Sequence, residues 1–220
     1  MKYILFSLIM VCFTVCKDLP NDVRWVTNSN EYKFLCHQTF NSAKIMLNDY
    51  LKNNKVHKNN KNLAIVMDLD ETVLDNSQYQ VEINSKNESF NMKSWALWVL
   101  REEAKLVPGV KKFIKKARKH NIQLIFISNR MDDRLIATKA NMKKLGIFSK
   151  DDIYLLRKNK KDKKDIRRKE IYFSSGRMKQ YNHFEVIQYF GDAMGDFPVL
   201  DHSEFGKSQF VLPNPMYGKW

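Results

Sequence analysis

Four short apolar runs, separated by amphipathic stretches, dominate the hydrophobic pattern of the chain. They span residues 63–68, 123–127, 153–156 and 184–190. Continuous apolar runs of this length are typical of strands that are buried on both faces. Because the stretches between them have helical periodicity, the pattern predicts an α/β fold with a Rossmann-like parallel sheet and right-handed crossovers.

The helical periodicity is clearest after Pro108-Gly109. Val110, Phe113, Ile114 and Ala117 recur at i, i+3, i+4 and i+7, which predicts a helix with one buried face. We expect further helices at residues 31–51, 134–145 and, with a break near 174–176, 160–178.

The segment from about residue 75 to 105 follows the first strand and contains no clean strand of its own. We interpret it as a small inserted cap. It is rich in aromatic residues, and Trp95 and Trp98 would share one helical face at i, i+3. Their side chains could pack in the core or stack against a substrate, and the sequence leaves both interpretations open.

The pattern divides the chain into residues 1–16, 17–62 and 63–220: a signal peptide, an N-terminal helical extension and the main domain. Residues 3–15 form a nearly unbroken apolar run after Lys2, too short to span a bilayer but typical of a signal peptide. Cys16 follows at the point where lipoprotein signals carry their lipid-bearing cysteine. Lipidation of Cys16 and simple cleavage both fit, so we expect either an outer-membrane lipoprotein held by a lipid anchor or a secreted, periplasmic protein.

The net charge of the chain raises the question of a nucleic-acid partner. The chain carries 38 Lys and Arg residues against 24 Asp and Glu, a net charge of +14, but the lysines are spread over many segments. Since no repeated aromatic–basic motif accompanies them, they indicate a solvated surface, and we predict no nucleic-acid partner. The three cysteines, Cys12, Cys16 and Cys36, imply no disulfide framework.

Polar groups follow three of the four predicted strands. Asp68 and Asp70 end the first, Ser128 ends the second, and Asp192 and Asp196 follow the fourth. The carboxyl ends of parallel strands meet at one edge of a sheet, which is where open α/β sheets bind ligands. We therefore expect these side chains to converge.

The converging residue types favour phosphoryl chemistry. Two sets of carboxylates suit Mg²⁺, whereas the His clusters and Cys pairs typical of zinc sites are absent from the sequence. A hydroxyl such as Ser128 and a cation such as Lys164 can bind phosphate oxygens, and a carboxylate can itself be the nucleophile. The P-loop of nucleotide hydrolases is also absent from the sequence.

The arrangement of these motifs resembles that of the haloacid dehalogenase (HAD) superfamily. Its four motifs correspond to Asp68-x-Asp70-x-Thr72, Ser128-Asn129-Arg130, a downstream Lys, and Gly191-Asp192-x-x-x-Asp196. Within the superfamily the chain is most similar to the class C acid phosphatases, which are bacterial and often lipoproteins. That similarity rests on residues 68–77, on Trp25-Val26 before Glu31-Tyr32, on Val107-Pro108-Gly109 and on Leu212-Pro213-Asn214-Pro215-Met216-Tyr217-Gly218, and it covers about residues 23–220.

The resemblance implies a role for each acid at the predicted edge. Asp68 would be the nucleophile and a Mg²⁺ ligand. Asp70 would be the general acid and base and would bind Mg²⁺ through its backbone carbonyl. Asp192 would be the third ligand, while Asp196 would support the waters of the metal and Thr72 would support the first motif.

The resemblance also implies how a substrate is held. Ser128 and Lys164 would bind the phosphate, with Lys161 and Lys163 as rivals for the lysine. Trp95 and Tyr217 would flank a nucleoside or an aryl group.

These implications define an expected function, an extracytoplasmic Mg²⁺-dependent acid phosphatase that hydrolyses phosphomonoesters through an aspartyl phosphate. The alternatives are an inactive surface or binding lipoprotein with the same fold, or a HAD phosphotransferase or sugar phosphatase. A small-molecule phosphomonoester is the expected substrate. The oligomeric state stays open, with a homodimer as one option.

Overall fold

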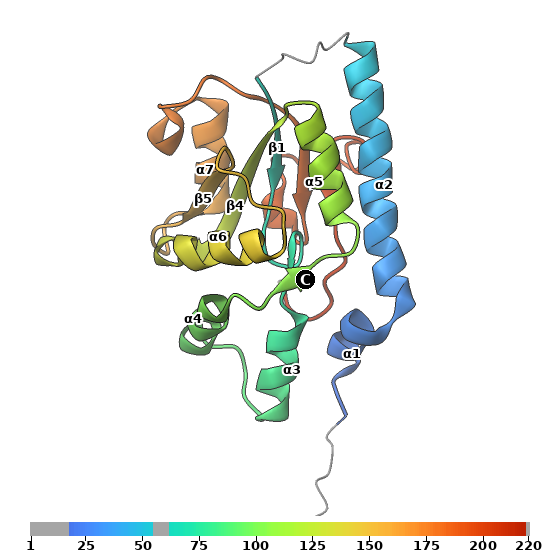
Figure 1. The fold of residues 1–220 in the computed structure, drawn as a ribbon, viewed down its shortest axis with the longest axis vertical. Coiled ribbons are helices and arrows are strands. Elements are labelled where there is room, and N and C mark those ends of the chain that lie inside the picture. Colours follow the sequence, from blue (N-terminus) through green and yellow to red (C-terminus); the bar gives the residue numbers. More distant parts are fainter. Residues whose placement is uncertain (1–17, 55–61, 219–220) are drawn as a thin grey trace, which may run out of the picture.

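A five-stranded parallel sheet forms the centre of the protein in the computed structural model, which describes residues 18–54 and 62–218 (Figure 1). Its strand order is β5-β4-β1-β6-β7, and every neighbouring pair is parallel. The strands are β1 (Leu63–Met67), β4 (Gln123–Met131), β5 (Ile153–Arg157), β6 (Glu185–Gly191) and β7 (Gln209–Val211). The predicted fold class is confirmed. The sequence pattern did not reveal β7, because three residues are too few to form a recognisable run.

Helices follow the strands as the periodicity predicts. They are α1 (Asn21–Asn28), α2 (Asn30–Asn53), α3 (Ser77–Ser85), α4 (Met92–Arg101), α5 (Val110–Lys119), α6 (Leu135–Lys144) and α7 (Lys164–Tyr172). The described part of the chain also contains the 3₁₀ turns η1 (Asp132–Arg134), η2 (Gly176–Met178) and η3 (Met194–Asp196). Within the basic stretch 160–178, the α-helix covers only Lys164–Tyr172, and a break before the 3₁₀ turn at Gly176 lies where it was expected.

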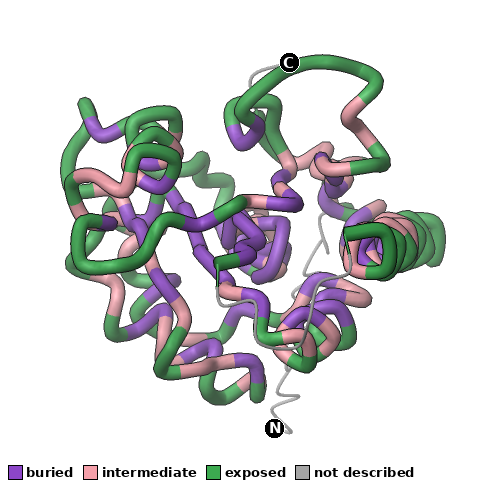
Figure 2. Tube along the Cα trace, turned by 90° about the horizontal axis from the view of Figure 1, so that it is seen from above, coloured by how far each residue is buried: buried purple, intermediate pink, exposed green. Residues whose placement is uncertain are grey.

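The two faces of the sheet are covered by different helices because neighbouring residues of a buried strand point to opposite sides. In β1, Ile65 and Met67 pack with α2, α5 and α6, whereas Ala64 and Val66 pack on the other face with Ile171 of α7. Figure 2 shows the resulting distribution, with buried residues at the centre of the molecule and exposed ones on the outer turns.

Helix α2 runs along the sheet and contributes to its main core (Figure 1). It begins after Ser29, whose side chain accepts a hydrogen bond from the Tyr32 backbone N–H. The buried face repeats every three or four residues, in Tyr32, Cys36, Phe40, Ala43 and Leu47. Phe40 stacks on Phe190 of β6, with ring centroids 5.6 Å apart.

The segment between β1 and α5 projects beyond the carboxyl ends of the strands and contains α3 and α4 (Figure 1). Its two ends meet in a short antiparallel pair, β2 (Leu74–Asp75) with β3 (Lys105–Leu106). The segment therefore leaves and re-enters the domain at one place, directly after the first motif.

The structure bears on membrane association only through the helices that it describes. None of the helices within residues 18–54 and 62–218 is both long and apolar enough to cross a bilayer. The predicted signal peptide and Cys16 lie outside the described residues.

The packing of α2 predicts that truncating Phe40 destabilises the whole domain. Phe40 is 1% exposed, so Phe40→Ala leaves a cavity against β6 and α5 and should lower the free energy of unfolding by about 3–5 kcal/mol. Urea denaturation measures the change. Phe34→Ala is the matched control, because Phe34 lies on the same helix and is 70% exposed. Equal losses for the two variants would contradict this packing.

Candidate functional site

Asp68 is the first residue after β1, and the neighbouring strand fixes its backbone. Its N–H donates to the Phe190 carbonyl of β6 at 2.9 Å. The chain then turns back sharply, since the Leu69 carbonyl accepts hydrogen bonds from the N–H groups of Val73 and Leu74. Asp68 is only 5% exposed, so its carboxylate is held in a buried position at the carboxyl edge of the sheet.

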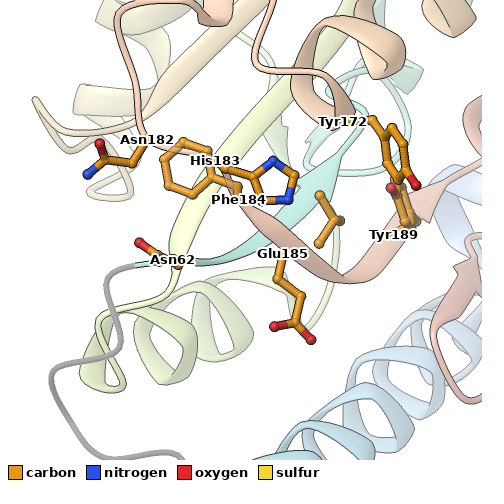
Figure 3. Close-up of a pocket in the computed structure, with 8 residues that line it drawn as sticks. Asn62, Tyr172, Asn182, His183, Phe184, Glu185 and Tyr189 are labelled. Carbon is orange, nitrogen blue, oxygen red and sulfur yellow. The ribbon is translucent and has the colours of Figure 1, made fainter.

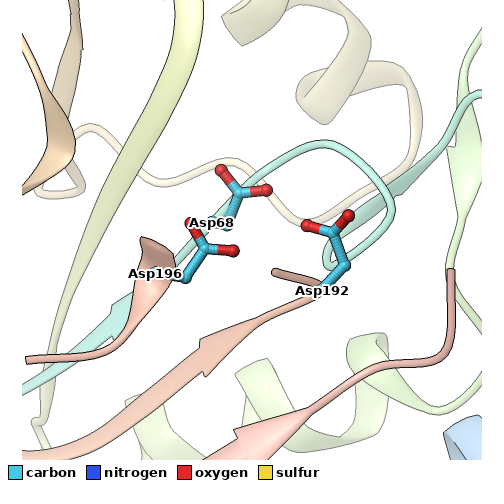
Figure 4. Close-up of side chains that lie close together, drawn as sticks. All are labelled: Asp68, Asp192 and Asp196. Atoms are coloured by element: carbon cyan, nitrogen blue, oxygen red, sulfur yellow. The ribbon is translucent and has the colours of Figure 1, made fainter. Parts of the chain in front are cut away.

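Two further carboxylates join Asp68 at this edge. Asp192 directly follows β6, and Asp196 ends η3. The ligand atoms of the three acids all lie within 4.8 Å of one another (Figure 4). The close approach needs a glycine at position 191, since an added Cβ there would lie 2.3 Å from the Asp196 Cβ. We call Asp68, Asp192 and Asp196 the acidic trio.

Lys164, the first residue of α7, provides the ammonium that contacts this trio. Its Nζ donates to Asp68 Oδ1 at 2.5 Å and also to Asp196 Oδ1. Burial alone lowers the pKa of Lys164, but the two carboxylates outweigh this effect and hold the pKa above its usual value. Lys164 is therefore a charged side chain that is partly buried, with 12% of its side chain exposed, whereas its sequence rivals Lys161 and Lys163 are exposed.

The acids themselves are electrostatically strained. Burial raises the pKa of Asp68 well above its usual range, and the Lys164 ammonium offsets part of this effect. Burial and, secondly, repulsion from Asp196 raise the pKa of Asp192 to about 6. Three carboxylates against one ammonium leave excess negative charge, and carboxylate oxygens are the ligands that hard divalent cations prefer. The donor set of the trio thus fits such a cation.

The side chain of Asp70 faces a different set of partners. Arg130 Nε and Asn76 Nδ2 donate to its Oδ1 at 2.9 and 3.0 Å, and Ser128 Oγ donates to its Oδ2 at 3.2 Å. The side chain of Asp70 is therefore oriented by Ser128 and Arg130 of β4 and by Asn76 of the cap, and not by the acidic trio. The cation role expected for Asp70 involves only its backbone carbonyl.

Sequence reasoning gave Arg130 no role, although it stands in the Ser-Asn-Arg motif. It is 2% exposed and ion-paired with Asp70. Strand alternation was the available signal, because residues two apart on β4, such as Ser128 and Arg130, share a face. Arg167 was also missed: it is fully buried and donates to the Ser128 carbonyl, which holds this part of β4 in place.

The cap contacts the site through Asn76. Asn76 Oδ1 accepts hydrogen bonds from Trp98 Nε1 at 2.9 Å and from Arg130 at 3.2 Å. Trp98 is buried, whereas Trp95 is half-buried, stands edge-on to Tyr79 and lies beneath the Arg130 guanidinium at 5.7 Å. Of the two tryptophans, Trp98 packs the core and Trp95 lies next to the partners of Asp70.

The remaining expected residues flank this centre. Tyr217 is 39% exposed on the C-terminal tail, and in the same tail Asn214 Nδ2 donates to Asp192 Oδ2 at 2.7 Å. Thr72 is fully buried, and its hydroxyl has no hydrogen-bond partner within the described part of the chain.

A surface pocket of about 720 Å³ lies elsewhere, beside the amino end of β6 (Figure 3). Glu185 and His183 line it together with Asn62, whose carbonyl accepts the Glu185 N–H. The acidic trio lies at the carboxyl ends of the same strands, so this pocket is separate from the site.

Comparison with known families identifies one match over nearly the whole chain. Residues 11–220 match the family model described as HAD superfamily, subfamily IIIB (Acid phosphatase). Among curated proteins, the Stem 31 kDa and Stem 28 kDa glycoproteins of Glycine max are each 28% identical over 171 residues, which is 76% of this chain. The alignment covers 63% of the length of each of these relatives.

Solved structures give a similar result. A class C acid phosphatase from Bacillus anthracis with tungstate bound is 29% identical and superimposes with a TM-score of 0.76, covering 90% of this chain and 84% of that one. A second structure of the class C acid phosphatase from that organism gives 28% identity and a TM-score of 0.75, with the same coverage.

The strained trio predicts that a divalent cation stabilises the protein in a pH-dependent way. The raised pKa of Asp192 means that its stabilising contribution is present below about pH 4 and is lost as the pH rises through 6. Ionised Asp192 is then free to bind a cation. With Mg²⁺ as the probe, the rise in melting temperature should be larger at pH 7.5 than at pH 5.

Differential scanning fluorimetry with and without EDTA measures this effect. Asp192→Asn should abolish most of the rise at both pH values, and the exposed-site variant Asp49→Asn should behave like wild type. A rise that is equal at the two pH values would contradict the role of Asp192.

Proposed function

The chain belongs to subfamily IIIB of the HAD superfamily, the acid phosphatases, and from this premise we propose that it is a Mg²⁺-dependent phosphomonoesterase. Its proposed substrates are 5′-nucleotides and aryl phosphates, and its proposed intermediate is an aspartyl phosphate on Asp68. The observation that carries the proposal is the partly buried contact between Asp68 and Lys164 at the carboxyl edge of the sheet.

The first step is attack by Asp68. One of its carboxylate oxygens forms a bond to phosphorus, and the bond from phosphorus to the ester oxygen breaks. Lys164, which touches Asp68, would neutralise the negative charge that gathers on the phosphoryl oxygens. We assign the other phosphate contact to the Ser128 hydroxyl, which lies 3.2 Å from Asp70.

Asp70 moves the protons. It donates one to the departing ester oxygen and later accepts one from the water that cleaves the aspartyl phosphate. This role requires a fixed carboxylate, and Arg130, Asn76 and Ser128 supply three hydrogen bonds that fix it.

The cation would be held by the carboxylates of Asp68 and Asp192 and by the Asp70 carbonyl, with Asp196 beside them. When bound, Mg²⁺ supplies positive charge that lets a phosphate anion approach the anionic nucleophile. The acid-rich donor set supports Mg²⁺ over a metal that prefers imidazole or thiolate.

We also propose a location outside the cytoplasm, on the basis of the apolar run 3–15. Cys16 offers lipid anchoring as one route and plain secretion as the other. Partitioning of the full chain between detergent and water, with and without Cys16→Ser, decides between them.

Loss of the nucleophile should abolish turnover. Asp68→Asn keeps the side-chain shape, but its neutral amide is a poor nucleophile, so kcat for p-nitrophenyl phosphate should fall at least ~10³-fold. Asp49→Asn on the exposed face of α2 should keep wild-type activity.

The same assay with EDTA tests the metal requirement. Wild-type hydrolysis that survives EDTA would contradict Mg²⁺ dependence, and residual Asp68→Asn activity within about tenfold of wild type would contradict the role of Asp68. A wild type without any hydrolysis would favour a binding protein.

Substrate choice should depend on Trp95 and Tyr217. Stacking on an aromatic side chain contributes roughly 1–3 kcal/mol per base in single-strand sites, so Trp95→Ala or Tyr217→Ala should raise KM for 5′-nucleotides about tenfold or more. KM for a small aliphatic phosphate should barely change, since its phosphate is bound elsewhere.

Leu97→Ala is the control for this comparison, because Leu97 lies on the same helix as Trp95 and is 57% exposed. Melting temperatures are recorded for all variants. A large loss of melting temperature with every substrate affected alike would mean that the two rings only pack the structure.

A further inference from the structure

Asn214 links the acidic trio to the C-terminal tail through both ends of its side chain. Its Nδ2 donates to Asp192 Oδ2 at 2.7 Å, and its Oδ1 accepts the Met216 backbone N–H at 3.1 Å. The orientation of the amide follows from its partners, because an ionised carboxylate only accepts and a backbone N–H only donates. Neither contact would survive a reversed amide.

The backbone around Asn214 holds this amide in place. Leu212, which is 1% exposed, donates its N–H to the Gly191 carbonyl at 2.8 Å, so the tail is attached to β6 next to Asp192. Pro213 and Pro215 flank Asn214, and a residue that precedes proline is restricted to extended conformations. The position of Asn214 is therefore set by the sheet rather than by Asp192.

Asp192 differs in this respect from the other two acids of the trio. Asp68 and Asp196 contact the charged Lys164, whereas the donor on Asp192 is a neutral amide. An amide orients a carboxylate without cancelling its charge, which leaves the charge of Asp192 available to a cation. Mutation of a residue that hydrogen-bonds to a metal ligand typically lowers metal affinity by 10–100-fold.

We propose that Asn214 is a positioning residue that holds Asp192 for the divalent cation and couples occupancy of the cation site to the tail that carries Tyr217. The inference rests on the proposed function, from which the cation and the role of Tyr217 are taken. Coupling of this kind is reciprocal: if the tail holds Asp192 for the cation, the bound cation must stabilise the tail by the same factor.

Calorimetric titration of metal-free, full-length protein with Mg²⁺, without substrate, tests the first half. Asn214→Leu keeps the number and branching of the side-chain heavy atoms but loses both hydrogen bonds, and Asn214→Ala removes the whole group. Both should raise Kd for Mg²⁺ about tenfold or more while the melting temperature of the metal-free protein stays near that of wild type. Asn48→Ala on the exposed side of α2 should leave Kd unchanged.

Amide hydrogen exchange in the wild type tests the second half and does not depend on whether a variant folds. Adding Mg²⁺ should slow exchange in the peptide that covers residues 212–218, because the Met216 N–H is bonded to Asn214. Exchange in β5, which lies at the edge of the sheet opposite β6 and β7, should not change. In Asn214→Leu the effect of Mg²⁺ on the tail should disappear, an outcome that a merely structural Asn214 would not produce.

The outcomes separate the inference from the function on which it rests. Equal Kd values for wild type and both Asn214 variants would overturn the inference alone. So would an amide exchange rate in the wild-type tail that is the same with and without bound Mg²⁺. A wild type that binds no Mg²⁺ would overturn the Mg²⁺-dependent function, and this inference with it.

Discussion

The confinement of three carboxylates to a few ångströms is the constraint on which the rest of the site depends. Burying one unpaired charge is already costly, and like charges at this distance repel each other further. Lys164 contacts only two of the three acids, Asp68 and Asp196. Burial and, secondly, the charge of Asp196 raise the pKa of Asp192 to about 6, and the negative charge that remains favours a divalent cation at this edge.

Strand pairing and aromatic packing hold the backbone next to the acids against this repulsion. Met67 pairs with Phe190 in the register of β1 and β6, which brings the ends of the two strands together. Phe190 in turn stacks on Phe40 and on Phe210, with ring centroids 5.6 and 5.1 Å apart. Because Phe190 lies two residues before Asp192, a movement of the acids away from one another would disturb this aromatic packing.

Sequence reasoning reached the parts of this site that depend on strand ends. The runs that became β1, β4 and β6 placed Asp68, Ser128 and Asp192 at one edge, because parallel strands share the direction of their carboxyl ends. Reasoning along one chain could not reach Asn76 and Asn214. Their importance lies in contacts with acids and backbone that only the folded cap and tail bring close, and asparagine in a turn is ordinarily explained by turn geometry alone.

Asn76 and Asn214 each join a carboxylate of the site to a neighbouring segment through a neutral amide. Each uses its Nδ2 to donate to a carboxylate of the site, Asp70 or Asp192, and each uses its Oδ1 to accept from a segment that carries an exposed or half-buried aromatic ring. A charged linker in either place would change the balance of charge on which the acids depend. A neutral amide fixes the distance and the orientation while leaving that balance unchanged, so the segments that would face a substrate's leaving group can be held against the acids without neutralising them.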